Sequence, residues 1–299
     1  INDPTKVDLS TKVDLPTKVD LPKLIPQQPV MLPQQPVMFP QVSRVSALPR
    51  VQIQRIVDAA PTIYHSLLIY GESDAGKTYL ASTWPDKSRV LLIDTALEEN
   101  VNTLRDWPEI GYACIEGWAQ LDALLLDLID NCPYDVIFFD GLTMFQNLFF
   151  DKYLTEKSKE TLSKDNFAED YVAWRYAMGN FLIKAKRIPA HRVFTALEAY
   201  PIEGRSKSVT AMPQISGQTG ILVRQTCSVV AHLQKVRDDL QPDNFKREIV
   251  VINNLSFVAR QRGGKLAAKE PADLWHIIQR LTGQIPQPER RKKSTPLNK

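Results

Sequence analysis

The chain carries Gly71-Glu72-Ser73-Asp74-Ala75-Gly76-Lys77-Thr78, which matches the pattern G-x-x-x-x-G-K-[ST] and directly follows apolar residues 67–70. This pattern predicts a strand, a tight loop and the start of a helix. The two glycines let the backbone turn so that successive N–H groups point at phosphate oxygens, and the positive end of the following helix attracts the same anion. We expect Lys77 to reach the β- and γ-phosphates and the Thr78 hydroxyl to hold Mg²⁺. Residues 71–78 are therefore the predicted nucleotide-binding loop.

A second apolar run further along the chain supplies a candidate metal ligand. Residues 136–139 are continuously apolar, which is typical of a strand buried on both faces, and Asp140 follows directly. Residues 141–143 are expected to form the exit loop. An Asp at a strand end is often only a turn or helix cap. In a chain that also carries a phosphate-binding loop, Asp140 is the expected partner of Thr78 in holding Mg²⁺.

Composition limits the number and kind of domains. The 299 residues are 43% hydrophobic and carry a net charge of +3, which suits one sizeable α/β core; a nucleic-acid partner must then be argued from local patches. The three cysteines lack C-x-x-C spacing, so neither a disulfide framework nor a zinc site is indicated. The sequence shows no export signal and no long apolar run, so we expect a cytoplasmic protein without a membrane partner.

Both ends of the chain are expected to be tails. In residues 1–41, Thr5-Lys6-Val7-Asp8-Leu9 recurs at 11–15 and 17–21, and periods this short do not form solenoid units. A second repeat, Pro26-Gln27-Gln28-Pro29-Val30-Met31, recurs at 33–38, and its prolines favour extended geometry. We therefore expect a flexible tail, either a docking segment or a neutral spacer. Residues 42–61 are the expected linker or helical lead-in, and 62–283 the folded domain. Residues 284–299 form a predicted basic tail.

Strand and helix patterns alternate between the tails. Strands are predicted over residues 66–70, 89–94, 135–140, 192–196, 227–236 and 248–257, with a weaker one over 111–115. Helices are predicted over residues 77–83, 121–128 and 167–182. This alternation favours an α/β fold, a mostly parallel sheet with helices on both faces, whose ligands sit at the carboxyl ends of the strands. The loop at 71–78 and Asp140 are both expected at that end.

Four of these stretches in order resemble the RecA-type ATPase core: residues 71–78, Leu-Leu-Ile-Asp at 91–94, Val-Ile-Phe-Phe-Asp-Gly-Leu-Thr at 136–143 and Arg-Val-Phe-Thr-Ala at 192–196. More narrowly, the chain resembles compact phage-encoded AAA-type nucleotide-binding proteins, some of which are single-strand annealing recombinases. Residues 213–218 look like the proline-to-glycine loop of those proteins, and residues 258–265 look like their basic turn. The resemblance covers roughly residues 62–283.

The resemblance implies a RecA-like P-loop ATPase with ATP and Mg²⁺ as cofactors. It also implies self-association into a ring or filament, single-stranded DNA as partner, a role in recombination or annealing, and the host cytoplasm if the protein is phage-encoded. The family's catalytic glutamate, two residues beyond Asp94, is replaced by Ala96. Glu98 and Glu99 follow and are candidates to position the attacking water beside the catalytic Lys77; the alternative is a pair of surface acids at a helix start. Other possible functions are a nucleotide-gated scaffold with little hydrolysis and a helicase loader or motor.

Assembly of this type brings a basic residue of one protomer to the γ-phosphate held by the next. Arg260, Arg262 and Lys265 are the candidates for this role, and a solvated basic turn is the alternative. Asp94 is either a group close to the phosphates or a strand-end cap. Glu198 is either a γ-phosphate sensor or an exposed loop acid.

DNA is expected at the loops that follow the strands. The segment 199–220 is predicted to be a long loop that contains Tyr200, Arg205 and Lys207. The two basic side chains would neutralise backbone phosphates, and the tyrosine ring would stack on a base.

Overall fold

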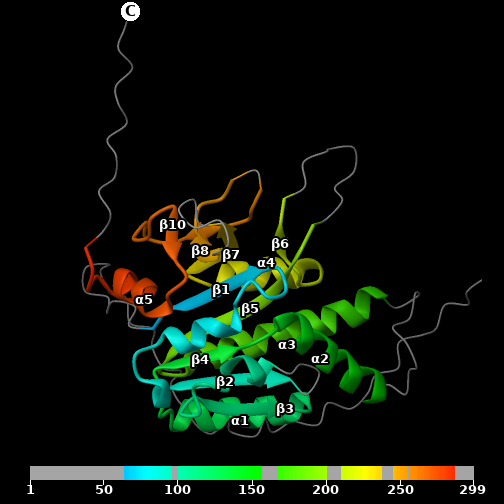
Figure 1. Ribbon diagram of the computed structural model, residues 1–299. Helices are drawn as coiled ribbons and strands as arrows, with labels where there is room; N and C mark the ends of the chain where they lie inside the picture. The colour runs from blue at the N-terminus through cyan, green and yellow to red at the C-terminus, as the bar shows by residue number, and fades with distance from the viewer. Residues whose placement is uncertain are drawn as a thin grey trace, which may run out of the picture. The chain divides into compact units, whose positions relative to one another are not determined.

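The computed structural model describes residues 64–95, 100–156, 167–200, 210–237, 245–254 and 256–286 (Figure 1). The predicted N-terminal tail and lead-in, residues 1–61, lie outside the described residues, as does the chain from residue 287 onward. The boundaries predicted for these tails therefore stay predictions.

One mixed sheet organises the described residues. Its main path runs β10-β8-β7-β1-β5-β4-β2-β3, and every neighbouring pair from β7 to β3 is parallel. Beyond β7 the pairing becomes antiparallel. The parallel strands are β1 (Ser66–Gly71), β2 (Val90–Thr95), β3 (Gly111–Ile115), β4 (Val136–Phe139), β5 (His191–Ala199) and β7 (Val229–Arg237). The antiparallel additions are β6 (Met212–Pro213), β8 (Phe245–Val250), β9 (Arg260–Gln261) and β10 (Lys269–Pro271). The mostly parallel sheet predicted from the sequence is confirmed.

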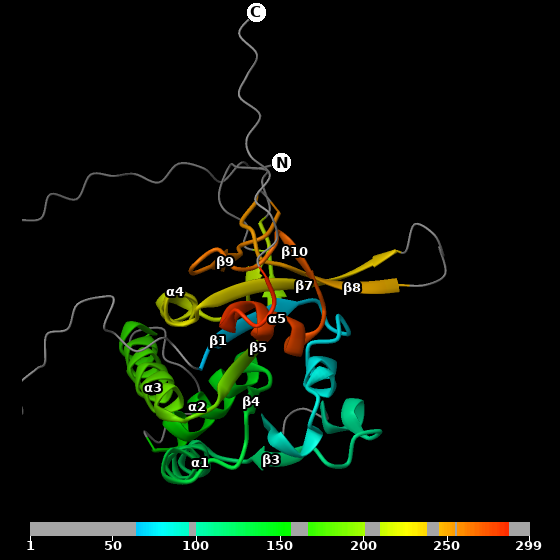
Figure 2. The same cartoon turned by 90° about the vertical axis from the view of Figure 1, so that its left-hand side faces the viewer.

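Each face of the sheet carries its own hydrophobic core. Successive side chains of a strand point to opposite faces, so Leu68 and Tyr70 of β1 enter one core, and Leu67 and Ile69 enter the other. The first core is covered by α1 (Trp118–Asp130), α2 (Leu142–Glu156), α3 (Phe167–Arg187) and α4 (Gly217–Thr226). The second is covered by the 3₁₀ helices η2 (Thr78–Thr83) and η4 (Asn100–Leu104) and by α5 (Leu274–Thr282). A further 3₁₀ turn, η3 (Lys87–Arg89), precedes β2. In Figure 2, α3 and α4 lie on one side of β1, and the cyan segment η2 lies on the other.

The structure corrects three expectations about individual elements. The exit loop predicted at 141–143 is only Gly141, with φ 80°, because α2 begins at Leu142. The strand predicted at 248–257 is instead β8, which covers residues 245–250. The segment 199–220, expected to be one long loop, contains the end of β5, strand β6 and the start of α4. Glycines at 217 and 220 hid the helix, because glycine is a poor helix former.

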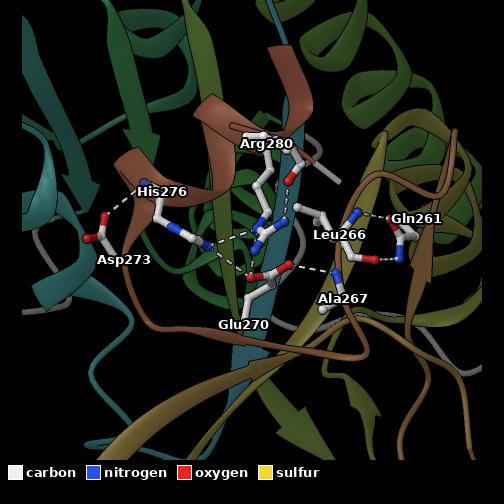
Figure 3. Close-up of polar contacts among 8 residues, drawn as sticks. Gln261, Leu266, Ala267, Glu270, Asp273, His276 and Arg280 are labelled. Carbon is white, nitrogen blue, oxygen red and sulfur yellow. Dashed lines mark hydrogen bonds and ion pairs between the residues drawn. The ribbon is translucent and has the colours of Figure 1, made fainter. Parts of the chain in front are cut away.

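A buried carboxylate fixes the C-terminal helix to the sheet edge (Figure 3). Glu270 of β10 is 3% exposed and accepts a hydrogen bond of 2.6 Å from the Ala267 backbone N–H. Its Oε2 lies 3.0 Å from His276 Nε2 and 3.3 Å from Arg280 Nε, both on α5. Asp273 caps the helix by accepting from the His276 backbone N–H. These contacts hold the first turn of α5, through Asp273 and His276, and its last turn, through Arg280.

Among the described helices, none combines the length and the apolarity that crossing a membrane requires.

Candidate nucleotide-binding site

The loop at 71–78 depends on both of its glycines. At Gly71, a Cβ atom would lie 2.3 Å from the carbonyl oxygen of Leu233, so a side chain would push β1 away from β7. Gly76 has φ +98°, a conformation that side chains rarely adopt, and its Cβ would collide with Arg247. Asp74 also has a positive φ of 61°, which Asp tolerates better than most residues. The sequence pattern therefore corresponds to a loop held close against neighbouring strands.

Lys77 folds back over this loop. Its Nζ donates hydrogen bonds to the carbonyl oxygens of Gly71, at 3.1 Å, and Glu72, at 2.7 Å. Lys77 also lines a cavity of about 440 Å³ together with Thr78 and Asp140. This volume lies within the range of sites for small-molecule ligands. The ammonium group is thus placed where phosphate oxygens would enter.

Asp140, which directly follows β4, contacts the loop that follows β1, although β5 lies between these two strands. Thr78 Oγ1 donates to Asp140 Oδ2 at 2.6 Å, and Thr195 Oγ1 of β5 donates to Oδ1. The Gly141 backbone N–H donates to the same Thr195 hydroxyl at 2.7 Å. Thr195 therefore orients Asp140. The sequence analysis predicted Thr195 only as part of a strand. The one feature that could have indicated its role is a hydroxyl within an apolar run.

Burial controls the ionisation of Asp140. The side chain is almost wholly buried, which raises its pKa, whereas the hydrogen bonds from Thr195 and Thr78 and the charge of Lys77 lower it. A buried carboxylate with a hydroxyl 2.6 Å away fits Mg²⁺, which takes oxygen ligands and few protein groups when phosphates supply the rest. With Mg²⁺ and nucleotide bound, Thr78 and Asp140 would hold the metal, which neutralises charge on the phosphate oxygens.

Asp94 lies at the end of β2 and has two different oxygens. Its Oδ1 accepts from the Thr95 backbone N–H at 2.8 Å and from Asn100 Nδ2 at 3.3 Å, as a strand-end cap would. Its Oδ2 is buried and has no hydrogen-bond partner within the described part of the chain. An orphaned carboxylate oxygen near Asp140 also suits a place behind the metal. Both interpretations of Asp94 thus keep support.

Burial, with a smaller effect of the Asp140 charge, raises the pKa of Asp94 to about 6, above its usual 3.8. Between these two values the folded state holds more protons than the unfolded chain, so the free energy of unfolding falls as pH rises through this window. The stabilising effect of protonated Asp94 is complete below about pH 4 and lost above about pH 6. At neutral pH, the ionised Asp94 therefore lowers the stability of the ligand-free protein.

The two candidate water-positioning acids, Glu98 and Glu99, lie outside the described residues, as does Ala96. The structure places their flanks: β2 ends at Thr95, and Asn100 begins η4 and lines the 440 Å³ cavity. The residue that follows both acids in the sequence, Asn100, therefore lies beside the cavity. Their catalytic role stays a prediction.

Two cations that line the 440 Å³ cavity were not predicted from the sequence. Arg247 of β8 donates from Nε to the Ala75 carbonyl oxygen at 3.1 Å, and its guanidinium carbon lies 5.2 Å from the ring centre of Tyr79. Lys235 of β7 pairs with Arg247 across the two strands and lines the same cavity. The sequence did not predict either residue in the cavity, because no local motif specifies the register of an antiparallel strand pair. Both add positive charge where a triphosphate would lie.

Replacing Arg247 with Ala is expected to weaken ATP binding by about tenfold, the effect of losing one charge-assisted hydrogen bond. Calorimetric titration with ATP and Mg²⁺ measures this directly. The matched control is Arg237→Ala, on the exposed part of β7 and outside the cavity lining. Equal affinities of the Arg247 variant and the parent would show that the guanidinium only supports the loop.

Glu198 is not an exposed loop acid. Its side chain is 5% exposed, and its Oε2 lies 2.7 Å from His232 Nε2. Tyr200 donates from its hydroxyl to Glu198 Oε1 at 2.6 Å, and this hydrogen bond raises the pKa of Tyr200 to about 12. All three side chains line a cavity of about 240 Å³ that also contains Glu72 of the loop. A γ-phosphate sensor at Glu198 stays a prediction.

The basic turn lies at the other end of the sheet from the loop. The Arg262 backbone N–H donates to Ser228, which is bonded to Ser66, the first residue of β1, whereas the loop begins at its last. All three candidate side chains donate to backbone carbonyls: Arg260 to Arg224 and Cys227, Arg262 to Gln225 and Lys265 to Leu281. Within one chain they do not reach the nucleotide cavity. Contact with a neighbour's nucleotide stays a prediction.

Of the candidate DNA-binding residues, only Tyr200 is among the described residues; Arg205 and Lys207 are not. The side chain of Tyr200 is 51% exposed, although its hydroxyl is held by Glu198. About half of Tyr200 therefore remains accessible to solvent, beside the 240 Å³ cavity that also contains Glu72.

The fold and the site together define an α/β protein of the P-loop NTPase class: a parallel sheet, a glycine loop after β1, and an acid two strands away that contacts the loop threonine. A family model described as an AAA domain matches residues 64–263 of the 299, more than half of the chain. The chain therefore belongs to this AAA-domain family of P-loop ATPases. No curated protein matches it.

Proposed function

We propose that this AAA-domain protein binds ATP with Mg²⁺, hydrolyses it, and acts on single-stranded DNA in recombination or strand annealing. The observation that carries the nucleotide part is the 2.6 Å contact between Thr78 and Asp140 inside a cavity of about 440 Å³ that also presents Lys77 and Arg247. One carboxylate, one hydroxyl and converging cations are the groups that a Mg²⁺-triphosphate requires.

Each group has a distinct task in this proposal. The backbone of residues 71–78 holds the phosphates, and Lys77 offsets charge as it builds up on the transferred phosphoryl group. Arg247 of β8 and Lys235 of β7 add charge to the same cavity. Water is positioned by Glu98 or Glu99. Because Lys77, Lys235 and Arg247 already line the cavity, little reorganisation of these three cations is left to the chemical step.

The DNA part of the proposal is supported by the continuity of β5. Thr195, Ala196 and Leu197 line the cavity of about 440 Å³, and β5 ends at Ala199, directly before the half-exposed Tyr200. A base stacked on the Tyr200 ring would contribute about 1–3 kcal/mol. Arg205 and Lys207 would add backbone contacts. Self-association into a ring or filament would let the basic turn of one protomer meet its neighbour's nucleotide.

A nucleotide-gated scaffold is the second candidate, favoured by Ala96 at the position where the resemblance implies a catalytic glutamate. Steady-state phosphate release with and without single-stranded DNA separates the two. We expect turnover that rises when DNA is added. Tight ATP binding without measurable turnover in either condition would favour the scaffold.

The DNA partner is tested by titrating a labelled oligothymidylate in ATP and Mg²⁺ at several salt concentrations. Tyr200→Ala should lower affinity about tenfold without changing the salt slope, because stacking releases no counterions. Tyr200→Phe is the matched control, since it keeps the ring and loses only the hydrogen bond to Glu198.

Arg205→Ala with Lys207→Ala should flatten the salt dependence of oligothymidylate binding by roughly 0.7 for each lost phosphate contact. No affinity in the parent at low salt would end the recombination proposal.

A further inference from the structure

A second cavity lies at the end of the sheet away from the nucleotide-binding loop. Its volume is about 750 Å³, and it is lined from the starts of β1 and β5 and the ends of α3, α4 and α5. Ser66 in its lining and Gly71 in the loop are the first and last residues of β1. At about 3.3 Å per strand residue, the two sites are roughly 17 Å apart along this strand.

Positive charge dominates the described lining of this cavity. Four cations contribute to this lining: Lys186, Arg192, Arg262 and Lys265. Among the described residues, no Asp or Glu contributes to it. The buried thiol of Cys227 reports the same concentration of charge. Burial raises its pKa to about 12, and the positive charges of Lys186, Arg192 and Arg262 are among the influences that oppose this rise. Side chains from distant parts of the sequence therefore bring like charges together here.

Arg192 is the buried member of this group, at 4% exposure. Its guanidinium donates to Ser66 Oγ and to the carbonyl oxygens of Ile188 and Tyr64, each at 3.0 Å. Its hydrogen-bond partners among the described residues are a hydroxyl and backbone carbonyls, with no carboxylate, and burial lowers its pKa to about 10. Burying a cation without a counter-anion is unfavourable, and here only neutral oxygens face the guanidinium. An anion in the cavity would supply the missing charge.

His65 adds a second, independent observation. It lines the same cavity and is 9% exposed, and its Nε2 is buried without a hydrogen-bond partner in the described part of the chain. Burial lowers the pKa of His65, and the charges of Lys265 and Arg192 lower it further. An anion beside these cations would reverse the electrostatic part of that shift.

We propose that this basic cavity, defined by Lys186, Arg192, Arg262, Lys265 and His65, is a second phosphate-binding site. The hydroxyls of Thr226 and Ser228 in the lining add neutral donors of the kind that phosphate oxygens accept. The phosphate group belongs either to free phosphate or to a nucleic-acid backbone, and the experiment separates these sources. The inference does not rest on the proposed function, because the cavity uses no residue of the 440 Å³ cavity and needs no neighbouring protomer, although Arg262 and Lys265 also belong to the basic turn.

The first arm titrates inorganic phosphate, at constant ionic strength with chloride as reference, into the chain carrying Lys77→Ala, so that the loop at 71–78 contributes little. Adding Lys186→Gln and Arg262→Gln should weaken phosphate binding at least tenfold, the effect of losing one charge-assisted hydrogen bond. The matched control adds Lys152→Gln and Arg175→Gln, two cations outside the cavity, of which Arg175 is exposed and Lys152 partly exposed. Arg192 is left intact because it also holds backbone carbonyls. The NMR signals of the His65 ring should show that phosphate raises the His65 pKa in the Lys77→Ala chain and in the control. They should show no such rise in the cavity variant.

The second arm replaces phosphate with a labelled oligothymidylate. A nucleic-acid source predicts at least tenfold weaker oligonucleotide binding in the cavity variant and a salt slope smaller by about 0.7 per lost contact. A free-phosphate source predicts weakened phosphate binding with unchanged oligonucleotide binding. The proposal is overturned if cavity variant and control bind both ligands alike, or if the parent binds neither. ATP titration of the chain with Lys77 intact reports on the nucleotide site separately.

Discussion

Replacing Lys77 with Ala is expected to weaken ATP binding by at least a hundredfold, about 3 kcal/mol. The ammonium group now lies over the carbonyl oxygens of Gly71 and Glu72 and faces the cavity, so the substitution removes the positive charge nearest to the incoming phosphates. Charge-assisted contacts to phosphate are among the strongest hydrogen bonds in proteins. Calorimetric titration with ATP and Mg²⁺ gives the two affinities.

Lys87→Ala is the matched control for this variant. Its ammonium group also donates to a backbone carbonyl, that of Trp84, but it lies outside the cavity lining. Both variants should keep the circular dichroism spectrum and melting temperature of the parent to within a few degrees. If the Lys77 variant bound ATP as tightly as the parent, the assignment of residues 71–78 would be wrong.

Replacing Asp140 with Asn is expected to reduce hydrolysis by at least a hundredfold while much of the ATP binding survives. The substitution keeps the size of the side chain but removes the charge that would organise Mg²⁺ beside Thr78. Phosphate release at saturating ATP measures turnover. Nucleotide affinity measured with and without Mg²⁺ should differ less in this variant than in the parent.

Asp135→Asn provides the control from the opposite end of the same strand. Asp135 forms a half-exposed ion pair with Arg89, and such surface pairs contribute little to stability. Its loss should leave turnover and its Mg²⁺ dependence unchanged. An Asp140 variant that hydrolyses ATP at the parent's rate would remove this residue from the catalytic site.

The parallel half of the fold could be predicted from the sequence because its strands are short apolar runs separated by helical patterns. Residues 66–70, 111–115 and 136–139 lie in strands β1, β3 and β4. The antiparallel half could not be predicted in the same way. Residues 245–248 are Phe-Lys-Arg-Glu, a charged segment that forms a strand by pairing with β7 and, at Glu248, with β10. Helix α2 was missed because its apolar side chains are not confined to one face.

The site divides along the same line. The loop at 71–78 and Asp140 are local patterns, so the sequence indicates them directly. Thr195 and Arg247 approach the same cavity from other strands, and their contribution depends on pairing between segments far apart in the chain. For the basic turn, sequence predicts charge but not direction, and the structure places Arg262 and Lys265 around another cavity.

The central position of β1 in the sheet determines the order in which parts of the domain would unfold. β1 pairs with β5 along all six of its residues and with β7 along four, whereas β3 and β10 each have a single neighbour in the main sheet. Backbone amides at such edges exchange with solvent through local opening, while those of a central strand exchange only when the whole domain unfolds. The loop that follows β1 is therefore attached to the slowest-exchanging unit of the chain. Fraying at β3, β10 or α5 would leave that attachment in place.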